Sequence, residues 1–303
     1  MFYIGIDVGA TKLAAGLWSA EEQFIKIIES DSNYITGEAL VQQICDAISS
    51  LMNFTPDKSN ITMIGIGIPG RIDDATQTVF SDSLGFPEGI PLKKRLTENI
   101  PCEVIIENDA NAAALGEFYY GAGLHSKNIL YVSVGTGIGA GLILDGRLYT
   151  GACHLAGELG HIVINPQSEI CTCGRKGCVE IIASGKAIGK KAVCLNKHIP
   201  NKKNATQDTQ EVFHAYHEGD QTASIIIEDA AWSLASAIHD AVNLLDPDIV
   251  IIGGGVVKEQ PKFIELIRKH LPHINIHPAQ LGAKLSGLYG SVALCNLHST
   301  KKE

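Results

Sequence analysis

Three cysteines and one histidine lie close enough in the sequence to bind a single metal ion. Cys171, Cys173 and Cys178 fall within eight residues, and His161 stands ten positions before the first of them. One imidazole and three thiolates form the ligand set of a closed tetrahedral zinc site, and the intervening glycines permit the tight loop that such ligation needs. A closed site leaves no position for a substrate water, so we expect a structural zinc.

Two carboxylates flank this cluster. Glu158 stands three residues before His161, and Glu180 stands two residues after Cys178. A metal that ordered the loop would also order both carboxylates, which can accept hydrogen bonds from the hydroxyls of a sugar. Either glutamate taken alone could instead belong to a solvated surface.

A further carboxylate stands where an expected strand meets an expected helix. The motif Asn108-Asp109-Ala110-Asn111 follows the strand 104–107 and opens the alanine-rich helix 109–120. From this position a carboxylate can point into a cleft outside the carboxyl ends of the strands. The alternative is that Asp109 serves as the N-cap of the helix, a position that favours aspartate.

Two turns of similar composition each join a pair of apolar strands. The first is Gly9-Ala10-Thr11-Lys12, shortly after Asp7, and the second is Gly135-Thr136-Gly137. Glycine lets the backbone approach a phosphate, threonine and main-chain N–H groups can donate to it, and Asp7 can hold hydrated Mg²⁺. An ordinary hairpin would explain one such turn, but the repeat predicts two turns that clamp a polyphosphate between them.

A third glycine run, Gly253-Gly254-Gly255, follows a buried strand and could let the sugar or base of a nucleotide lie against the main chain. A simple strand-to-helix turn is the alternative. The pattern Gly-x-Gly-x-x-Gly also occurs from Gly65 to Gly70, where it would suggest a dinucleotide-binding turn. Because Pro69 occupies this turn and residues 71–74 are typical of a turn rather than a helix, we discount that interpretation.

Expected strands and helices alternate along the chain, which predicts the α/β class. Apolar patterns predict strands at 2–7, 13–18, 24–29, 61–68, 104–107, 128–134, 139–144 and 249–252, and helices at 37–53, 109–120, 220–245 and 287–298. The repeated turn implies two similar halves. We place their boundary at the turn 121–123, which gives an N-terminal lobe of residues 1–121, joined by the C-terminal helix 287–303, and a C-terminal lobe of residues 122–286.

Composition narrows the function further. The 303 residues are enough for about two domains with buried cores, and 33 acidic against 24 basic residues give a net charge of −9. This balance argues against nucleic acid as a partner, and no apolar stretch is long enough for a membrane helix. The N-terminus lacks the basic region and cleavage site of a secretory signal, so a reducing cytoplasm is the expected compartment.

Taken together, five motifs closely resemble those of the ROK family (repressor, open reading frame, kinase). They are Asp7-Val-Gly-Ala-Thr-Lys12, Glu107-Asn-Asp-Ala-Asn-Ala112, Val134-Gly-Thr-Gly-Ile-Gly139, Gly157-Glu-Leu-Gly-His161 and Cys171-Thr-Cys-Gly-Arg-Lys-Gly-Cys-Val-Glu180. Their order and spacing agree with the family across nearly the whole chain. The resemblance implies an actin/hexokinase-type, ribonuclease H-like fold of two lobes with a cleft between them, and it implies a homodimer.

The resemblance also implies roles for individual residues. Asp109 would be the catalytic base, and the sugar would be bound by Gly70, Asn108, Glu158, His161 and Glu180. The three glycine turns would hold ATP, Asp7 would bind Mg²⁺ through water, and His161 with the three clustered cysteines would bind zinc. Two departures stand out. Ala10 replaces a glycine that is common in the first turn, and residues 80–87 lack the family's usual pattern, so no sugar contact is carried over to them.

The family contains sugar kinases and sugar-responsive repressors, and the kinases are favoured here. Repressors carry a helix-turn-helix before the first phosphate turn, whereas only six residues precede Asp7. We therefore expect ATP-dependent phosphorylation of a hexose at its primary C6 hydroxyl. Gly157 and the cysteine-only loop resemble members that use glucose, our first expectation, or N-acetylmannosamine, with fructose as a further alternative.

Overall fold

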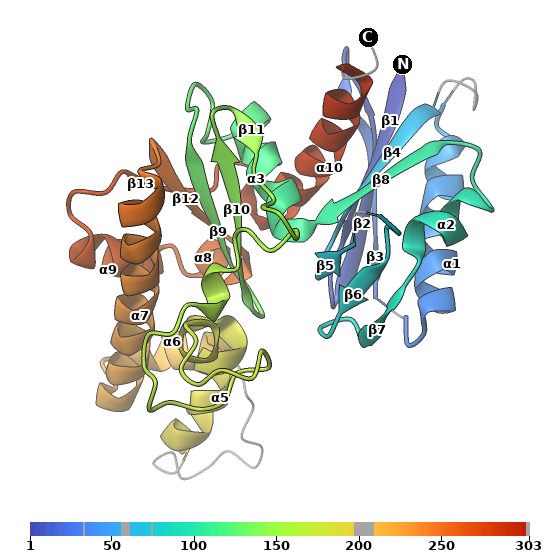
Figure 1. Cartoon of the computed structure of the whole chain (residues 1–303). Helices are drawn as coiled ribbons and strands as arrows, with labels where there is room; N and C mark the ends of the chain where they lie inside the picture. Colours follow the sequence, from blue (N-terminus) through green and yellow to red (C-terminus); the bar gives the residue numbers. More distant parts are fainter. Residues whose placement is uncertain (33, 56–60, 74, 197–208, 301–303) are drawn as a thin grey trace.

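The computed structural model describes residues 1–32, 34–55, 61–73, 75–196 and 209–300. Two lobes stand side by side in Figure 1, and each is built on a five-stranded sheet. The strands of the first sheet are β1 (Phe2–Val8), β2 (Lys12–Ser19), β3 (Gln23–Asp31), β4 (Ile61–Ile68) and β8 (Glu103–Asn108). Those of the second sheet are β9 (Ile129–Val134), β10 (Ile138–Leu144), β11 (Arg147–Leu148), β12 (Ile249–Gly253) and β13 (Ile276–Pro278).

The two sheets share one topology. Their strand orders are β3-β2-β1-β4-β8 and β11-β10-β9-β12-β13. In each sheet three strands pair antiparallel, and two more strands then run parallel to the third of them. The internal repeat predicted from the two glycine turns is therefore confirmed, because each turn joins equivalent strands, β1 to β2 and β9 to β10.

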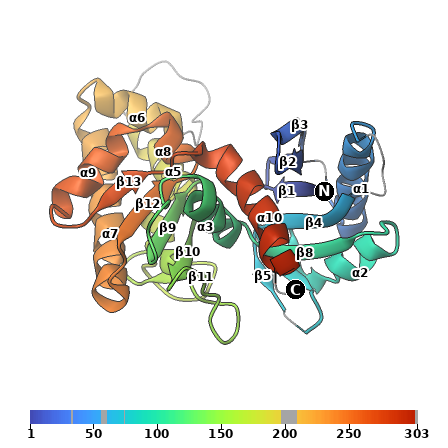
Figure 2. The ribbon, with the colours of Figure 1, turned by 90° about the horizontal axis from the view of Figure 1, so that it is seen from above.

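Helices cover both faces of each sheet, which explains why the inner strands β1, β4, β9 and β12 are almost continuously apolar. In the first lobe α1 (Gly37–Met52) and α2 (Leu92–Thr97) pack on one face, and α10 (Gly282–Thr300) packs on the other (Figure 2). In the second lobe α7 (Gln221–Leu245) and α9 (Lys262–His270) cover one face, and α3 (Asp109–Tyr120) covers the other. The remaining helices are α4 (Glu180–Ala183), α5 (Gly185–Asn196), α6 (Thr209–His217) and α8 (Gly255–Glu259).

Helices α3 and α10 pack directly on each other between the two sheets (Figure 2). Glycines allow their backbones to approach closely. A Cβ atom on Gly290 would lie 1.6 Å from the carbonyl oxygen of Ala112, and one on Gly116 would lie 2.2 Å from that of Ser286. Any larger residue at these points would force the two helices apart.

The structure tests two local predictions, the Asp220 cap and the turn after Gly70. Asp220 caps α7 as predicted, because its side chain accepts a hydrogen bond from the backbone N–H of Ala223. The expected turn after Gly70 was wrong in part. Arg71–Ile72 forms the short strand β5, which pairs with β6 (Val79–Ser81) and β7 (Phe86–Ile90) in a small third sheet, while Asp74 lies outside the described residues.

The α/β class is confirmed by this architecture. The division into 1–121 with 287–303 and 122–286 stays a prediction, and residues 301–303 lie outside the described residues. Among the helices that the structure describes, none has the length and apolar character needed to cross a bilayer.

Candidate active site

Two half-buried carboxylates lie at one edge of the first sheet. The parallel strands place Asp7 of β1 opposite Gly67 of β4, and Gly67 opposite Glu107 of β8, two residues before Asp109. Burial raises the pKa of Asp7 to about 7, and the charge of Asp109 contributes to this increase. Helix α10 lies behind Asp7, since a Cβ atom on Gly287 would be 2.6 Å from the carboxyl carbon.

Asp109 is the first residue of α3, but it is not the cap. The N-cap is Asn108, whose Oδ1 accepts hydrogen bonds from the backbone N–H groups of Ala110 at 2.9 Å and Asn111 at 3.2 Å. The alternative that Asp109 serves as the N-cap is therefore wrong. Burial raises the pKa of Asp109 to about 6, hydrogen bonds from backbone N–H groups oppose this, and the charge of Glu158 adds to it.

The corner that carries Asp109 is held by side chains of β8 and α3 and by the backbone of Gly70. Asn108 Nδ2 donates to the carbonyl oxygen of Gly70, at 3.1 Å, so these two predicted sugar-binding residues are in direct contact. Glu107 Oε1 accepts from the backbone N–H of Asn108 at 2.8 Å and from Nδ2 of Asn111 at 3.0 Å. Sequence reasoning missed this role of Glu107 and Asn111, although both lie within the recognised motif.

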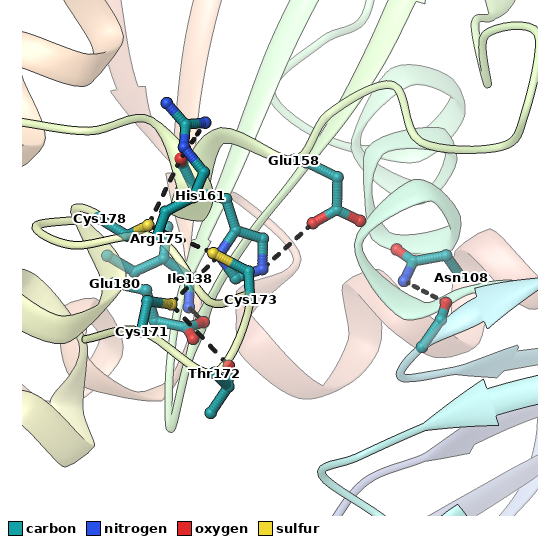
Figure 3. A network of polar contacts seen from close by, with 11 residues as sticks. Asn108, Ile138, Glu158, His161, Cys171, Thr172, Cys173, Arg175, Cys178 and Glu180 are labelled. Carbon is teal, nitrogen blue, oxygen red and sulfur yellow. Dashed lines mark hydrogen bonds and ion pairs between the residues drawn. The ribbon is translucent and has the colours of Figure 1, made fainter. Parts of the chain in front are cut away.

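His161, Cys171, Cys173 and Cys178, hereafter the cysteine cluster, converge in space (Figure 3). Their ligand atoms all lie within 4.8 Å of one another. His161 Nδ1 is 3.5 Å from Cys171 Sγ, and Cys173 Sγ is 3.5 Å from Cys178 Sγ. One nitrogen and three sulfurs at these separations fit a tetrahedral zinc ion, so the predicted ligand set is brought together by the fold.

The histidine of this cluster faces two ways. While Nδ1 points at the sulfurs, Nε2 lies 3.6 Å from Oε2 of Glu158, in the view of Figure 3 on the side toward Asn108. Burial raises the pKa of Glu158, His161 opposes that change, and the charge of Glu180 adds to it. The second lobe thus presents Glu158 and the Nε2 edge of the imidazole toward the corner that carries Asp109.

The first turn (Gly9–Lys12) is closed by its own backbone and braced by hydroxyl groups. The N–H of Gly9 donates to the carbonyl of Lys12 at 2.8 Å. The carbonyl of Gly9 accepts from Ser32 Oγ at 2.8 Å and from the hydroxyl of Tyr34. Ala10 keeps a negative φ, so its replacement of glycine causes no strain. Sequence reasoning missed Ser32 and Tyr34 because no motif contains them.

The second turn (Gly135–Gly137) is braced differently. Its Gly135 carbonyl accepts from the N–H of Gly185 at 2.8 Å, and Glu180 Oε2 accepts from the N–H of Ile138, the residue directly after the turn, at 2.9 Å. Glu180, predicted to bind sugar, therefore contacts the segment predicted to bind phosphate (Figure 3).

The third glycine run lies beside the second turn. Gly253 ends β12, Gly254 has a φ of 93°, and Gly255 starts α8. A Cβ atom on Gly254 would lie 2.4 Å from the carbonyl oxygen of Val134, which directly precedes the second turn. This run is both a strand-to-helix turn and a close backbone approach, and only glycine fits at Gly254.

Two sheets of one topology, joined by the packed helices α3 and α10, define the actin/hexokinase-type fold. The chain is 31% identical to a ROK family glucokinase from Streptomyces griseus, solved in complex with glucose and AMPPNP, with a TM-score of 0.84 over 97% of this chain and 99% of that one. The ROK family model matches residues 3–291, and the chain belongs to the ROK family.

Relatives of two kinds occur within this family. The chain is 33% identical over 280 residues to a glucokinase of Halalkalibacterium halodurans, covering 89% of this chain and 84% of the relative. It is also 32% identical over 276 residues to the xylose repressor of Bacillus subtilis, covering 89% of this chain and 68% of the repressor.

Proposed function

We propose that this protein is an ATP-dependent hexose kinase that phosphorylates the primary C6 hydroxyl of an aldohexose, with glucose as the preferred sugar. The observation that carries the proposal is the position of Asp109. Its carboxylate lies at the carboxyl end of β8, partly buried, with a pKa raised to about 6, and the charge of Glu158 contributes to this increase. Relatives described as glucokinases support the same substrate class.

The chemistry requires a base beside the attacking hydroxyl. Asp109 accepts the proton of that hydroxyl as the oxygen attacks the γ-phosphorus of ATP, and the bond to the β-phosphate oxygen breaks. A carboxyl with a pKa of about 6 is ionised at neutral pH and is a stronger base than an ordinary aspartate. Most of the rate enhancement then comes from holding the two substrates in line and neutralising charge.

The sugar lies between Asn108 and Gly70 on one side and Glu158, His161 and Glu180 on the other. These groups offer carboxylate oxygens, an imidazole edge and an amide to the ring hydroxyls. A sugar that lacked a hydroxyl at such a position would leave a desolvated polar group unpaired, at a cost of roughly 1–3 kcal/mol each.

ATP is held by the two turns and by Gly253, Gly254 and Gly255, which give backbone N–H groups access to the phosphates and open surface to the nucleoside. Asp7 is the residue that would hold Mg²⁺ through water. The fit rests on the carboxylate pair, since the charge of Asp109 makes ionisation of Asp7 less favourable and a cation held by Asp7 would relieve this. When bound, Mg²⁺ would neutralise charge on the phosphates.

The cysteine cluster is proposed to bind one structural zinc ion. His161 and the three cysteines would fill a tetrahedral set of ligands, so the ion would order the loop that carries Glu158 and Glu180 and would take no direct part in the reaction. A homodimer and a cytoplasmic location are proposed from the family resemblance and from thiols that must stay reduced. Light scattering on the purified protein should give twice the chain mass of 32.4 kDa.

A coupled assay of ADP release tests the proposed function. We expect kcat/KM to be highest for glucose among glucose, mannose, N-acetylmannosamine and fructose, with the Asp109→Asn variant as the inactive control. The repressor relatives define the competing outcome. Sugar binding by calorimetry without ADP release from any of the four sugars would favour a sugar-responsive regulator, and a clear preference for fructose would overturn the assignment of glucose.

A further inference from the structure

One short segment of the second lobe connects the cysteine cluster to the second turn. The backbone N–H of Val179, directly after Cys178, donates to the carbonyl of Ile162, directly after His161, at 2.9 Å. Further along the same segment, Gly185 N–H donates to Gly135 at 2.8 Å and Lys186 N–H donates to Thr136 at 3.4 Å. Residues 178–186 therefore run alongside the second turn and start at a buried ligand of the cluster.

Glu180 makes the only side-chain hydrogen bond between this segment and the second turn in the described part of the chain. Its Oε2 lies 2.9 Å from the N–H of Ile138. The approach depends on Gly137, because a Cβ atom there would lie 2.5 Å from Glu180 Oε2. The second oxygen, Oε1, has no hydrogen-bond partner among the described residues and remains available to a ligand.

Glu180 is also close to the group of residues that faces the sugar. Its charge is one of the causes that raise the pKa of Glu158, whose carboxylate lies 3.6 Å from the imidazole of His161. One carboxylate is thus placed between the residues proposed for the sugar and the turn proposed for the phosphates. At the first turn, the side chains that contact the Gly9 carbonyl in the described part of the chain are hydroxyls rather than a carboxylate.

We propose that Glu180 is a positioning residue shared by both substrates. Oε2 holds the second turn in the shape that binds phosphate, while Oε1 accepts a hydrogen bond from the sugar. Because binding of one substrate fixes a carboxylate that the other substrate also uses, binding of either substrate favours binding of the other by the same factor, as linkage requires. This inference rests on the proposed function and adds the coupling between its two substrates.

The first test changes Glu180, a residue proposed to bind sugar, and measures the affinity for the nucleotide. The affinity for a non-hydrolysable ATP analogue with Mg²⁺ is measured by calorimetry in the absence of sugar. Glu180→Ala should weaken it about ten-fold, because a charge-assisted hydrogen bond to the turn is lost. Glu180→Gln, which keeps an oxygen for the Ile138 N–H, should restore most of that affinity. The matched control Glu158→Ala, on the same loop, should change it less than about two-fold.

The second test changes Gly137, a residue of the second turn, and measures the affinity for glucose. Gly137→Ala puts a methyl group 2.5 Å from Glu180 Oε2 and should weaken glucose binding about five-fold, measured with no nucleotide present. Gly135→Ala is the matched control, since a Cβ atom at Gly135 meets nothing within 4 Å. Its glucose affinity without nucleotide should equal that of the parent protein.

The outcomes separate this inference from the proposed function. If the unaltered protein binds neither glucose nor the analogue, the proposed function fails. If it binds both, and neither Glu180→Ala nor Gly137→Ala affects the substrate at the other site, the shared role of Glu180 is overturned. Metal content measured on each variant identifies any loss of the cluster, and Gly137→Ala, which leaves the cluster residues intact, then decides the question.

Discussion

The two phosphate turns have the same local plan and different supports. Each joins antiparallel strands of equivalent position, and each carries glycine and threonine. The first turn is braced by the hydroxyls of Ser32 and Tyr34, which come from the segment that follows β3 in the same sheet. The second turn is braced by Glu180 and Gly185, which belong to the segment that begins at the cysteine cluster.

This difference predicts that the first turn affects only the binding of ATP, whereas the second turn also affects the binding of sugar. In the described part of the chain, the braces of the first turn are hydroxyls that end on the Gly9 carbonyl, so we expect a change there to have no effect on the sugar. A change at the second turn passes through Glu180 to the loop of Glu158 and His161. Four predictions test this contrast. The first concerns Asp109, the proposed base.

Asp109→Asn should have the largest effect, a fall in kcat of about 10²–10⁴-fold, because it removes the proton acceptor while preserving shape. Binding of sugar and of ATP analogue should change little, since asparagine keeps the shape of the side chain and the cap of α3 is Asn108. Single-turnover kinetics with calorimetry checks both statements. Turnover within a few-fold of the parent, at equal thermal stability, would contradict the assignment of the base.

Cys173→Ser should come next. We expect about one zinc ion per parent chain, a much lower content in the variant, and glucose affinity lowered by about 10–100-fold, because the loop that carries Glu158 and Glu180 loses its order. ATP affinity should fall as well through the second turn. Elemental analysis and calorimetry measure these quantities. A metal-free preparation with full activity would be incompatible with the zinc proposal.

The pH dependence gives a smaller effect. Asp109 acts as a base only when ionised, and its pKa is raised to about 6, so kcat/KM should be constant well above pH 6 and fall about ten-fold per pH unit below it. Asp7, with a pKa raised to about 7, should steepen the decline by losing its charge beside the first turn. A pH profile that stays flat between pH 5 and pH 8 would rule out a raised pKa at the base.

Tyr34→Phe should have the smallest effect. It removes one of the two hydroxyls that donate to Gly9, and Ser32 remains, so the KM for ATP should rise about two- to five-fold. Glucose affinity should be unchanged, in contrast to the expected effect of Gly137→Ala at the second turn. Steady-state kinetics with each substrate varied in turn makes the comparison, and an equal loss for both substrates would remove the distinction between the turns.

Much of the fold could be predicted because its signals are local. The strand β4 has seven buried residues out of eight, and the apolar stripe of α7 follows helical spacing from an Asp220 cap. The short strand β5 could not be predicted, because two residues carry no periodic pattern and its pairing with β6 depends on a chain reversal. For the same reason, the turn expected at this position was wrong in part.

The sequence identified many residues of the candidate site, but it did not predict most of the contacts between them. The four ligands of the cysteine cluster were predicted by spacing alone, and the structure brings them together. The sequence did not predict which of two adjacent polar residues caps α3, because Asn108 and Asp109 are equally good caps. The carbonyl of Gly70 helps to fix the orientation of Asn108. The roles of Ser32 and Tyr34 depend on how β3 pairs with β2, which no local pattern specifies.

The position of α10 has a consequence for how the chain is made. Tyr3, Trp18 and Met63 on the first sheet are covered by Val292 and Cys295 of this last helix. On the ribosome, the strands of the first lobe therefore emerge early with one apolar face uncovered, and that face stays open until the whole second lobe has been synthesised. The first lobe is expected to be the last to complete folding, and its nascent form is the stage at which chaperones would be needed most.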